Sequence, residues 1–351
     1  MMEHIKNIAQ LQALAEKHIA EDYFHYLEGG ADDQRTLSRN ITAFQSIQIR
    51  PRRLVDVREV DTSVQILGQD LPSPIILAPV GWQGYFHSDG EIATARAAQS
   101  TGHLMIASTV SVHPYSDIAK ELERKPWFQL YPTTDRRITK LLLKKAEDEG
   151  CTVVVLTIDL PVAGNREKHI RTLTQGLKNE QKQTGNLRGL LKEGETPWDS
   201  SMTWDIIAWL SANTQMKIVL KGILTHEDAS LAVKYGADAI IVSNHGGRQL
   251  ESDLATIEAL SEITDAVARK IPVLFDGGIR RGTDILKALA IGADAVCIGR
   301  AYCYGLGAGG QAGVERAIQI LQEELVRNMK LTGVTSIQQL NRNYVRLGMF
   351  K

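Results

Sequence analysis

Short apolar runs alternate with longer amphipathic segments along most of the chain, beginning near Pro72. Eight of these runs are continuously apolar rather than alternating, which is typical of parallel strands buried on both faces. The predicted strands are 75–78, 105–107, 127–130, 153–157, 217–220, 239–242, 273–275 and 295–298. The predicted helices are 90–101, 116–123, 136–149, 204–213, 226–235, 254–269, 283–291 and 313–329. Eight strand–helix units predict an α/β fold, a (β/α)₈ TIM barrel.

A weak internal repeat supports this fold. The segment 236–243, Gly-Ala-Asp-Ala-Ile-Ile-Val-Ser, resembles the segment 292–299, Gly-Ala-Asp-Ala-Val-Cys-Ile-Gly. In both copies a glycine that stops a helix leads into a buried strand, as stacked strand–helix units require. A doubly wound sheet is the alternative. It usually has fewer than eight parallel strands and a Gly-x-Gly-x-x-Gly motif after the first strand, and this sequence has no such motif there.

The residues before the barrel predict a helical extension. Apolar residues recur at helical spacing over 8–27, and Gly29-Gly30 offers a helix stop. We therefore expect one domain over 1–351, made of a helical extension (1–70), a barrel (71–330) and a C-terminal tail (331–351).

The longest stretch without periodicity runs from about Leu160 to Ser201 and is polar and glycine-containing. Loops of this length inside a compact domain usually serve as lids or are disordered. This loop follows the fourth strand, so we expect it to lie over the catalytic face of the barrel.

Composition and charge exclude several classes of function. Lys plus Arg number 40 against 41 for Asp plus Glu, a net charge of −1, so electrostatics favour neither nucleic acid nor an anionic membrane as a partner. No run approaches the roughly 18 apolar residues of a membrane helix. The three cysteines, Cys151, Cys297 and Cys303, have no zinc-like spacing and are expected to be reduced thiols. We predict a cytoplasmic protein without a metal.

Candidate chemistry begins at the end of the sixth strand, in the loop Ser243-Asn-His-Gly-Gly-Arg-Gln249. His245 can accept a proton near neutral pH, and Arg248, three residues on, can hold a carboxylate through two hydrogen bonds. A base and a carboxylate clamp on one loop suggest a 2-substituted acid as substrate. The alternative is a glycine turn whose histidine and arginine are merely solvated.

Polar residues, glycine or proline also follow each of the seven remaining predicted strands. In a barrel these strand ends meet on one face, where the active site lies. They are Ala78–Gly81, Ser108, Gln129–Tyr131, Thr157–Asp159, Lys221, Asp276–Arg280 and Gly299–Arg300, with Arg166 further into the loop after strand four.

The last two strand ends predict a phosphate site. Asp276-Gly-Gly-Ile-Arg280 and Gly299-Arg300 place small residues where backbone N–H groups can converge on an anion, and barrels often bind phosphate after strands seven and eight. Arg280 and Arg300 can each add a charged guanidinium whose paired N–H donors match a phosphate. The alternative is two tight turns with surface arginines.

Together these motifs, with Phe128-Gln-Leu-Tyr131 and Lys221-Gly222, resemble the family of FMN-dependent 2-hydroxy acid oxidases and dehydrogenases. That family includes glycolate oxidase, lactate oxidase, lactate monooxygenase and mandelate dehydrogenases. The similarity extends from Tyr26 to the last helix. It implies that FMN oxidises an L-2-hydroxy acid to the 2-keto acid and is reoxidised by O₂, giving H₂O₂. A quinone or other carrier as acceptor, or a decarboxylating monooxygenase reaction, remains open, and a homotetramer or homo-octamer is expected.

The resemblance also implies roles for individual residues. FMN would be held along the flavin ring, at its N1 and O2 edge, and at the ribityl and phosphate groups. The residues matching these three sites are, in turn, Ala78, Pro79, Val80, Gly81, Ser108, Gln129 and Thr157; Lys221 and Ser243; and Asp276, Gly277, Gly278, Arg280, Gly299 and Arg300. Those matching the substrate-binding residues are Tyr26, Tyr131, Arg166, His245 and Arg248. His245 matches the general base, Asp159 the carboxylate that orients it, and Tyr131 a further catalytic residue.

Two departures from the family pattern bear on the substrate. Gly81 stands where many of these oxidases have Ala, and Val110 stands where glycolate oxidase has Trp. Both changes are expected to widen the space over the flavin and so to favour branched or aromatic acids over glycolate. Outside this class, the phosphate loops also fit flavin-dependent isomerases, inosine monophosphate dehydrogenase or a non-catalytic FMN-binding protein. The set His245, Arg166 and Arg248 argues against these.

Overall fold

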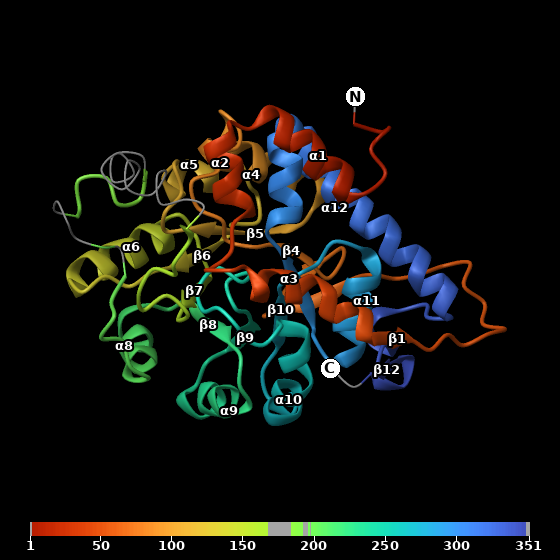
Figure 1. Cartoon of the computed structure of the whole chain (residues 1–351). Helices are drawn as coiled ribbons and strands as arrows, with labels where there is room; N and C mark the ends of the chain where they lie inside the picture. Colours follow the sequence, from red (N-terminus) through yellow and green to blue (C-terminus); the bar gives the residue numbers. More distant parts are fainter. Residues whose placement is uncertain (1, 168–183, 192–195, 197, 349–351) are drawn as a thin grey trace.

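The computed structural model describes residues 2–167, 184–191, 196 and 198–348 (Figure 1). Its centre is a closed barrel of eight parallel strands in the order β10-β11-β4-β5-β6-β7-β8-β9, which confirms the predicted TIM barrel. The strands are β4 (Ile75–Leu77), β5 (Leu104–Ser108), β6 (Trp127–Leu130), β7 (Val153–Thr157), β8 (Lys217–Ile223), β9 (Ala239–Val242), β10 (Val273–Asp276) and β11 (Ala295–Ile298). All eight lie at the positions that the apolar runs predict.

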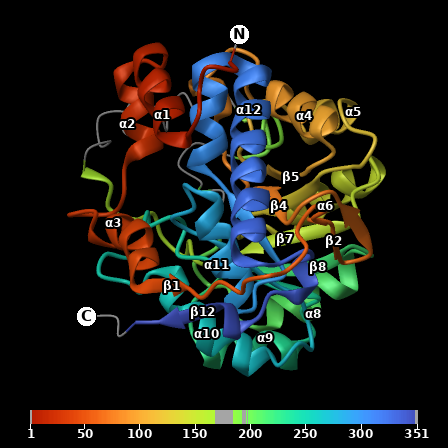
Figure 2. The ribbon, with the colours of Figure 1, turned by 90° about the vertical axis from the view of Figure 1, so that its right-hand side faces the viewer.

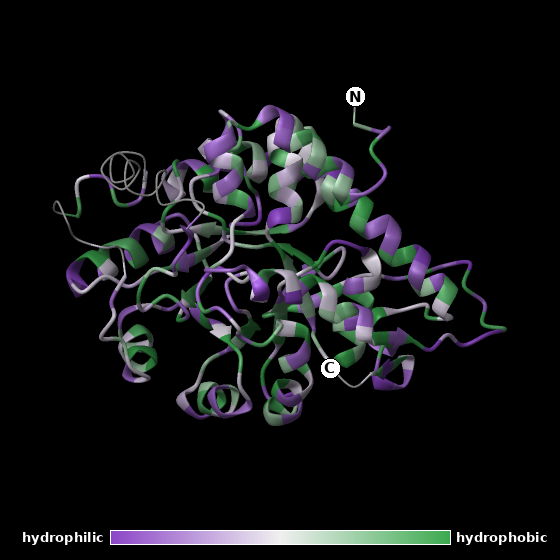
Figure 3. Cartoon of the chain, viewed as in Figure 1, coloured by the Kyte–Doolittle hydropathy of each residue, from purple (hydrophilic) through white to green (hydrophobic). Residues whose placement is uncertain are grey.

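Helices surround the barrel and follow its strands in turn. They are α4 (Gly90–Thr101), α5 (Tyr115–Lys120), α6 (Arg136–Asp148), α8 (Asp205–Asn213), α9 (His226–Tyr235), α10 (Thr256–Val267), α11 (Gly282–Ile291) and α12 (Arg300–Thr332). The strand residues are almost entirely buried, with Trp127, Phe128 and Phe275 among the largest core side chains. Figure 3 shows the same division, with hydrophobic strands inside helices of mixed character. No helix in the described part of the chain has the length and apolar character needed to cross a membrane.

The N-terminal extension contains α1 (Ile8–His18), α2 (Glu21–Glu28) and α3 (Arg35–Thr42). The helical spacing over 8–27 is thus divided between two helices, which the spacing alone did not reveal. Ile19 and Ala20 are extended, with ψ of 137° and 140°, and they separate α1 from α2. The buried Ile19 side chain contacts Gly307 of α12, where a Cβ would not fit beside it. Tertiary packing thus overrides the local helical pattern at this point.

The last helix also differs from its prediction. A helix was expected over 313–329, but α12 begins at Arg300, directly after β11, and continues to Thr332. Gly309 and Gly310 have non-helical backbone angles and kink it. At the kink the backbones of Gly305 and Gly313 meet without room for a side chain on either. Because this part of the chain is rich in glycine, its sequence does not predict a helix. The same glycines allow the two halves of α12 to pack together.

Two small sheets lie outside the barrel, and the sequence pattern predicted neither. β1 (Ile47–Ile49) pairs antiparallel with β12 (Val345–Leu347), and β2 (Val64–Ile66) pairs antiparallel with β3 (Gln69–Leu71). Figure 2 shows β1 and β12 side by side near the C-terminus. The extension and the tail are therefore joined through their backbones, while α1 packs on α12.

Candidate active site

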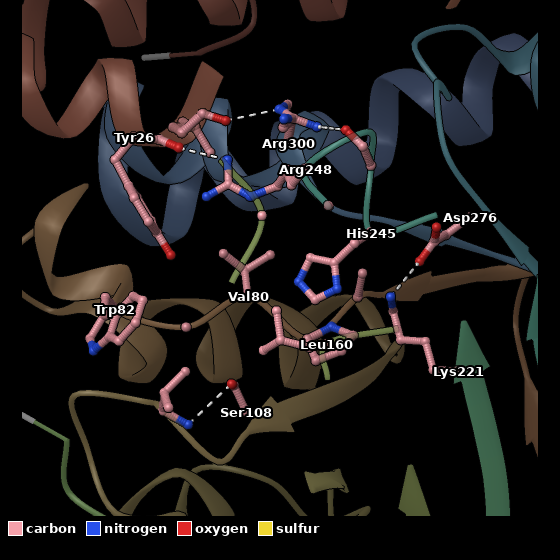
Figure 4. A pocket seen from close by; sticks show the side chains of 18 of the residues that line it. Tyr26, Val80, Trp82, Ser108, Leu160, Lys221, His245, Arg248, Asp276 and Arg300 are labelled. Carbon is pink, nitrogen blue, oxygen red and sulfur yellow. Dashed lines mark hydrogen bonds and ion pairs between the residues drawn. The ribbon is translucent and has the colours of Figure 1, made fainter. Parts of the chain in front are cut away.

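A cavity of about 330 Å³ lies at the carboxyl ends of the barrel strands, beside α2 (Figure 4). Its size falls within the usual range for small-molecule sites. Most residues that the sequence singled out line it, although they come from separate strand ends, from α2 and from the loop after β7. They are Tyr26, Ala78, Pro79, Val80, Gly81, Ser108, Tyr131, Arg166, Lys221, His245, Arg248, Asp276, Gly277, Gly278, Arg280, Gly299 and Arg300.

Four singled-out residues, Gln129, Thr157, Asp159 and Ser243, lie directly behind this lining. Gln129 accepts a hydrogen bond from Ser108 Oγ at 3.0 Å and donates one to Thr157 Oγ1 at 3.0 Å. Ser243 Oγ accepts from Lys221 Nζ at 2.7 Å. These buried groups orient side chains that face the cavity. Direct contact of Gln129, Thr157 and Ser243 with a cofactor stays a prediction.

The loop after β9 turns sharply to present His245. His245, Gly246 and Gly247 all have positive φ, of 57°, 65° and 72°. A left-handed conformation is uncommon for a residue with a side chain and is found where surrounding contacts enforce it, often at functional sites. Figure 4 shows the resulting orientation, with the His245 imidazole directed into the pocket between Arg248 and Leu160.

His245 is paired with Asp159, from the end of β7. Its Nδ1 lies 2.8 Å from Asp159 Oδ1. Burial lowers the pKa of His245, and the charge of Asp159 offsets only part of that effect. Burial alone would raise the pKa of Asp159, but the charges of His245 and Lys221 outweigh it and hold that pKa below its usual value. At neutral pH a neutral imidazole therefore donates its Nδ1 proton to a carboxylate, which leaves Nε2 free to act as a base.

Two arginines face the same space without an ion-pair partner among the residues that the structure describes. Arg166 donates to the Arg248 carbonyl at 3.1 Å and to Gln249 Oε1 at 2.8 Å. Burial, followed by the charge of Arg248, lowers the pKa of Arg166 to about 10, so it stays protonated at neutral pH. The Arg248 guanidinium lies 4.8 Å from the centre of the Tyr26 ring. Two unpaired cations in one cavity favour an anionic ligand such as a carboxylate.

A buried ion pair lies on the other side of His245. Lys221 Nζ is 3.2 Å from Asp276 Oδ2, and both side chains are nearly buried. Burial alone would lower the pKa of Lys221, but the charges of Asp276 and Asp159 raise it, so the amine is charged. Asp276 Oδ1 is buried and has no hydrogen-bond partner among the residues that the structure describes. Because a buried carboxylate oxygen normally accepts a hydrogen bond, this atom calls for a donor on a bound molecule.

The ends of β10 and β11 form a cradle of small residues. Gly277 and Gly278 have φ of 112° and 75°, and Gly278 packs so closely on the Asn40 carbonyl that a side chain would not fit. A Cβ on Gly299 would instead face open space, with its nearest neighbours 4.0 Å away. The unpaired N–H groups that begin α12 follow at once. This cradle suits a phosphate, Asp276 a ribityl hydroxyl, and Lys221 the polar edge of a flavin, so the residues present fit FMN.

Part of the cavity lining is apolar, and among its residues the sequence singled out Val110 alone. We call Val110, Leu160, Leu187, Leu191 and Trp198 the apolar wall; all five line the cavity. Trp82 and Phe86 extend it. These residues carry no motif, and the one available signal was the long loop after the fourth strand. The parts of that loop at 168–183, 192–195 and 197 lie outside the described residues.

Asn186 anchors the described part of this loop. Its side chain accepts from the Tyr115 N–H at 2.7 Å and donates to the carbonyls of Ser108 and Thr109 at 3.1 and 3.2 Å. Gly185 N donates to the Ser111 carbonyl at 2.9 Å. The loop after β7 is thereby tied to the loop after β5, which sets Leu187 in the cavity.

The expectation that Gly81 and Val110 each widen the cavity is wrong in one respect. A Cβ placed on Gly81 would overlap Cγ2 of Val110 and lie 3.1 Å from the Val110 carbonyl. Val110 therefore occupies the volume that an alanine methyl group would need. The two positions form a packed pair and do not add their space.

Comparison with known proteins gives consistent results. The sequence profile of the FMN-dependent dehydrogenase family matches residues 15–347. The chain is 42% identical to a peroxisomal (S)-2-hydroxyacid oxidase of Arabidopsis thaliana over 353 residues, covering 98% of this chain and 97% of the relative. It is 42% identical to an L-lactate oxidase of Nostoc over 357 residues, covering 97% of this chain and 98% of the relative. It is 43% identical to 2-hydroxyacid oxidase 2 of Homo sapiens over 347 residues, covering 97% of each.

Solved structures of related proteins superpose over nearly the whole chain. A mutant of an active chimera of (S)-mandelate dehydrogenase has a TM-score of 0.91 at 34% identity, covering 98% of this chain and 99% of the other. A mandelate oxidase mutant solved with (S)-mandelic acid has a TM-score of 0.88 at 37% identity, with the same coverage.

Proposed function

This chain belongs to the family of FMN-dependent 2-hydroxy acid oxidases and dehydrogenases, and from that premise we propose which acid it oxidises and which acceptor it uses. The reaction itself is the FMN-dependent oxidation of a 2-hydroxy acid to the 2-keto acid. We propose that the preferred substrates are L-2-hydroxy acids with a branched or aromatic side chain, and that O₂ is the acceptor and is released as H₂O₂.

The acid-oxidising chemistry behind this proposal is supported by the pairing of His245 with Asp159 in the same cavity as Arg166 and Arg248, which have no ion-pair partner among the described residues. Arg166 and Arg248 would bind the substrate carboxylate and fix the position of C2. Tyr131 and Tyr26 line the same space. Burial raises the pKa of Tyr131, so its hydroxyl stays protonated and can donate a hydrogen bond to the substrate.

His245 would take the proton that the substrate loses, at Nε2. Asp159 would then stabilise the resulting imidazolium, since an ionised carboxylate is already in contact with Nδ1. Bound FMN would supply the acceptor for the two electrons. Lys221, charged beside Asp276, would hold the polar edge of the flavin and favour negative charge there. Whether the proton leaves oxygen or carbon does not change these roles.

The apolar wall supports the choice of side chain. A branched or aromatic substituent on C2 could contact Leu160, Leu187 and Trp198, whereas glycolate has no substituent to bury. Each methylene removed from water contributes about 0.8 kcal/mol, and one methylene changes specificity roughly 10- to 200-fold. The solved relatives with mandelate in their names support an aromatic acid, and the relatives named as oxidases support O₂ as acceptor.

The test is a substrate and acceptor panel on the purified protein. The released cofactor should be FMN by mass. Anaerobic additions of glycolate, L-lactate, L-2-hydroxyisocaproate and L-mandelate should bleach the flavin, with kcat/KM rising with the size of the side chain. Admitting air should restore the colour with one H₂O₂ per keto acid. Glycolate as the best substrate would refute the substrate proposal, and reoxidation by a quinone but not by O₂ would refute the acceptor.

Location and assembly stay predictions. The three cysteines are buried thiols, which suits the reducing cytoplasm, but the Arabidopsis relative is named as peroxisomal. Cell fractionation decides the location. Native mass measurement decides between the expected homotetramer and homo-octamer.

A further inference from the structure

We propose that Arg300 is a positioning residue that joins the cofactor side of the cavity to its substrate side by holding the C-terminus of α2. The resemblance assigned Arg300 to the FMN phosphate. Its side-chain contacts indicate instead that it holds the end of α2. This inference rests on the proposed function only in the measurement of carboxylate binding.

The guanidinium of Arg300 is surrounded by backbone carbonyls. Nε donates to the Leu27 carbonyl at 2.8 Å, and Nη2 donates to the carbonyls of Gly29 at 2.8 Å and Glu28 at 3.4 Å. Nη1 donates to the Gly246 carbonyl at 2.9 Å. A guanidinium has five N–H donors, and these contacts engage four of them. Little of its hydrogen-bonding capacity is left for a phosphate.

Arg280 provides the contrast within the same cradle. Its guanidinium makes one short hydrogen bond, from Nη1 to its neighbour's carbonyl on Ile279 at 2.9 Å, and a long one to Tyr304 Oη at 3.5 Å. Most of its donors are therefore available to an anion. Of the two arginines, Arg280 is the better phosphate ligand.

The end of α2 needs such a partner. The last carbonyls of any helix lack intrahelical donors and carry partial negative charge, so a cation there is stabilising. α2 has only 8 residues, too few to be stable without tertiary contacts. Gly246 makes the approach possible, because a Cβ at that position would lie 2.8 Å from Arg300 Nη1.

Substrate-binding groups depend on the same helix end. α2 carries Tyr26, which lines the cavity. Arg248 Nη1 donates to the carbonyls of Tyr26 and Gly29 at 2.8 Å each. Figure 4 shows Arg248 and Arg300 side by side, both directed at this turn. If Arg300 is lost, the carbonyls of Leu27 and Glu28 lose their donor, and Tyr26 and Arg248 lose their fixed place.

The experiment compares Arg300→Met with Arg280→Met, a matched loss of one arginine from the same cradle. FMN affinity is measured on the apoprotein by flavin fluorescence. Affinity for oxalate, an unreactive carboxylate, is measured on the FMN-loaded protein by the change in flavin absorbance. Hydrogen–deuterium exchange follows the peptide that covers 21–31.

We expect Arg300→Met to weaken oxalate binding roughly 10- to 100-fold, because a misplacement of about 1 Å can cost about 10²-fold in rate and the same side chains would hold the carboxylate. It should also speed exchange over 21–31, and it should weaken FMN less than Arg280→Met does. Arg280→Met should weaken FMN and leave that exchange unchanged. Arg300→Lys should fall between wild type and Arg300→Met in both oxalate affinity and exchange, since an ammonium can pair with the helix end but cannot span both sets of carbonyls.

The opposite pattern overturns the proposal: FMN affinity lost as in Arg280→Met, with exchange over 21–31 as in wild type. If Arg300→Met does not fold, Arg300→Lys must show faster exchange over 21–31 than wild type. Exchange unchanged from wild type in that variant would also overturn the proposal. Failure of the proposed function is a separate result, since wild type would then oxidise no 2-hydroxy acid while the exchange and FMN measurements still test the contact with α2.

Discussion

The two sides of the cavity are built in different ways. The polar side consists of Lys221, His245, Asp276 and Arg280, each within a few residues of a strand end, where the closed barrel fixes the backbone. The apolar wall comes mainly from the long segment after β7, held in place by the side chain of Asn186. The barrel therefore sets the chemistry, while the choice of substrate depends on a loop that can change without disturbing it.

The largest effect should come from the polar side. His245→Gln removes the proposed base but keeps a side chain of similar size, so FMN and oxalate should still bind. Flavin reduction by substrate should slow by about 10²- to 10⁴-fold, the usual contribution of a general base. Anaerobic stopped-flow reduction measures it, and a rate within a few-fold of wild type would exclude His245 as the base.

The pH dependence provides the control for that variant. Because burial lowers the pKa of His245, the imidazole is neutral above a value that lies below the ordinary 6.5. Flavin reduction should therefore be independent of pH near neutrality and fall as the pH drops through that lowered pKa. Because the folded state lowers the pKa of His245, protonation of this residue favours the unfolded state. The stability that neutral His245 contributes is therefore fully present above pH 6.5 and is lost as the pH falls through the lowered pKa. His245→Gln should abolish this acid limb.

The next largest effect should come from Arg166, where the polar side meets the apolar wall. Arg166→Met removes one of two cations that would hold a desolvated carboxylate. Losing one partner of such a pair costs roughly 2–5 kcal/mol. The Kd of oxalate and the KM of every acid in the panel should rise together. Titration of oxalate measures the effect, and an unchanged Kd would remove Arg166 from the site.

A smaller effect should appear where Gly81 packs on Val110. Gly81→Ala forces the Val110 side chain to move, and overpacking of this kind costs about 1–3 kcal/mol. The double substitution Gly81→Ala with Val110→Ala should recover most of the lost stability, which denaturant unfolding of the three variants measures. Additive losses would show that the two residues are not in contact.

The smallest effect should be confined to the apolar wall. Trp198→Ala should lower kcat/KM for L-mandelate by about tenfold, as expected for a lost hydrophobic contact. The value for L-lactate, whose methyl group offers little apolar surface to an indole, should change little. Steady-state kinetics on both acids measure this ratio. An equal fall for both would place Trp198 outside the specificity wall.

The sequence predicted the polar side better than the apolar wall, for physical reasons. Parallel strands buried on both faces leave continuous apolar runs, so residues such as Lys221 and Asp276 could be placed at strand ends without coordinates. Leu187 and Trp198 follow no such run, and their place depends on distant hydrogen bonds such as those of Asn186 to the Ser108 loop.

Two further features depended on contacts that no local pattern reveals. The break at Ile19 is imposed by packing against α12, where the spacing alone favours one continuous helix. The contacts of Arg300 were missed because Gly-Arg after a last barrel strand is typical of a phosphate site. Only the three-dimensional structure shows that the end of α2 lies against this arginine.

The packing of α1 on α12 has a consequence for the order of events during synthesis. α1 is among the first segments to leave the ribosome, yet its partner is completed only at Thr332, and β1 must wait for β12 at Val345–Leu347. Contacts between such distant parts of the chain form late, because a long loop must close before they contribute. We therefore expect α1 to remain without its helical partner, and β1 without its paired strand, until synthesis has passed Leu347.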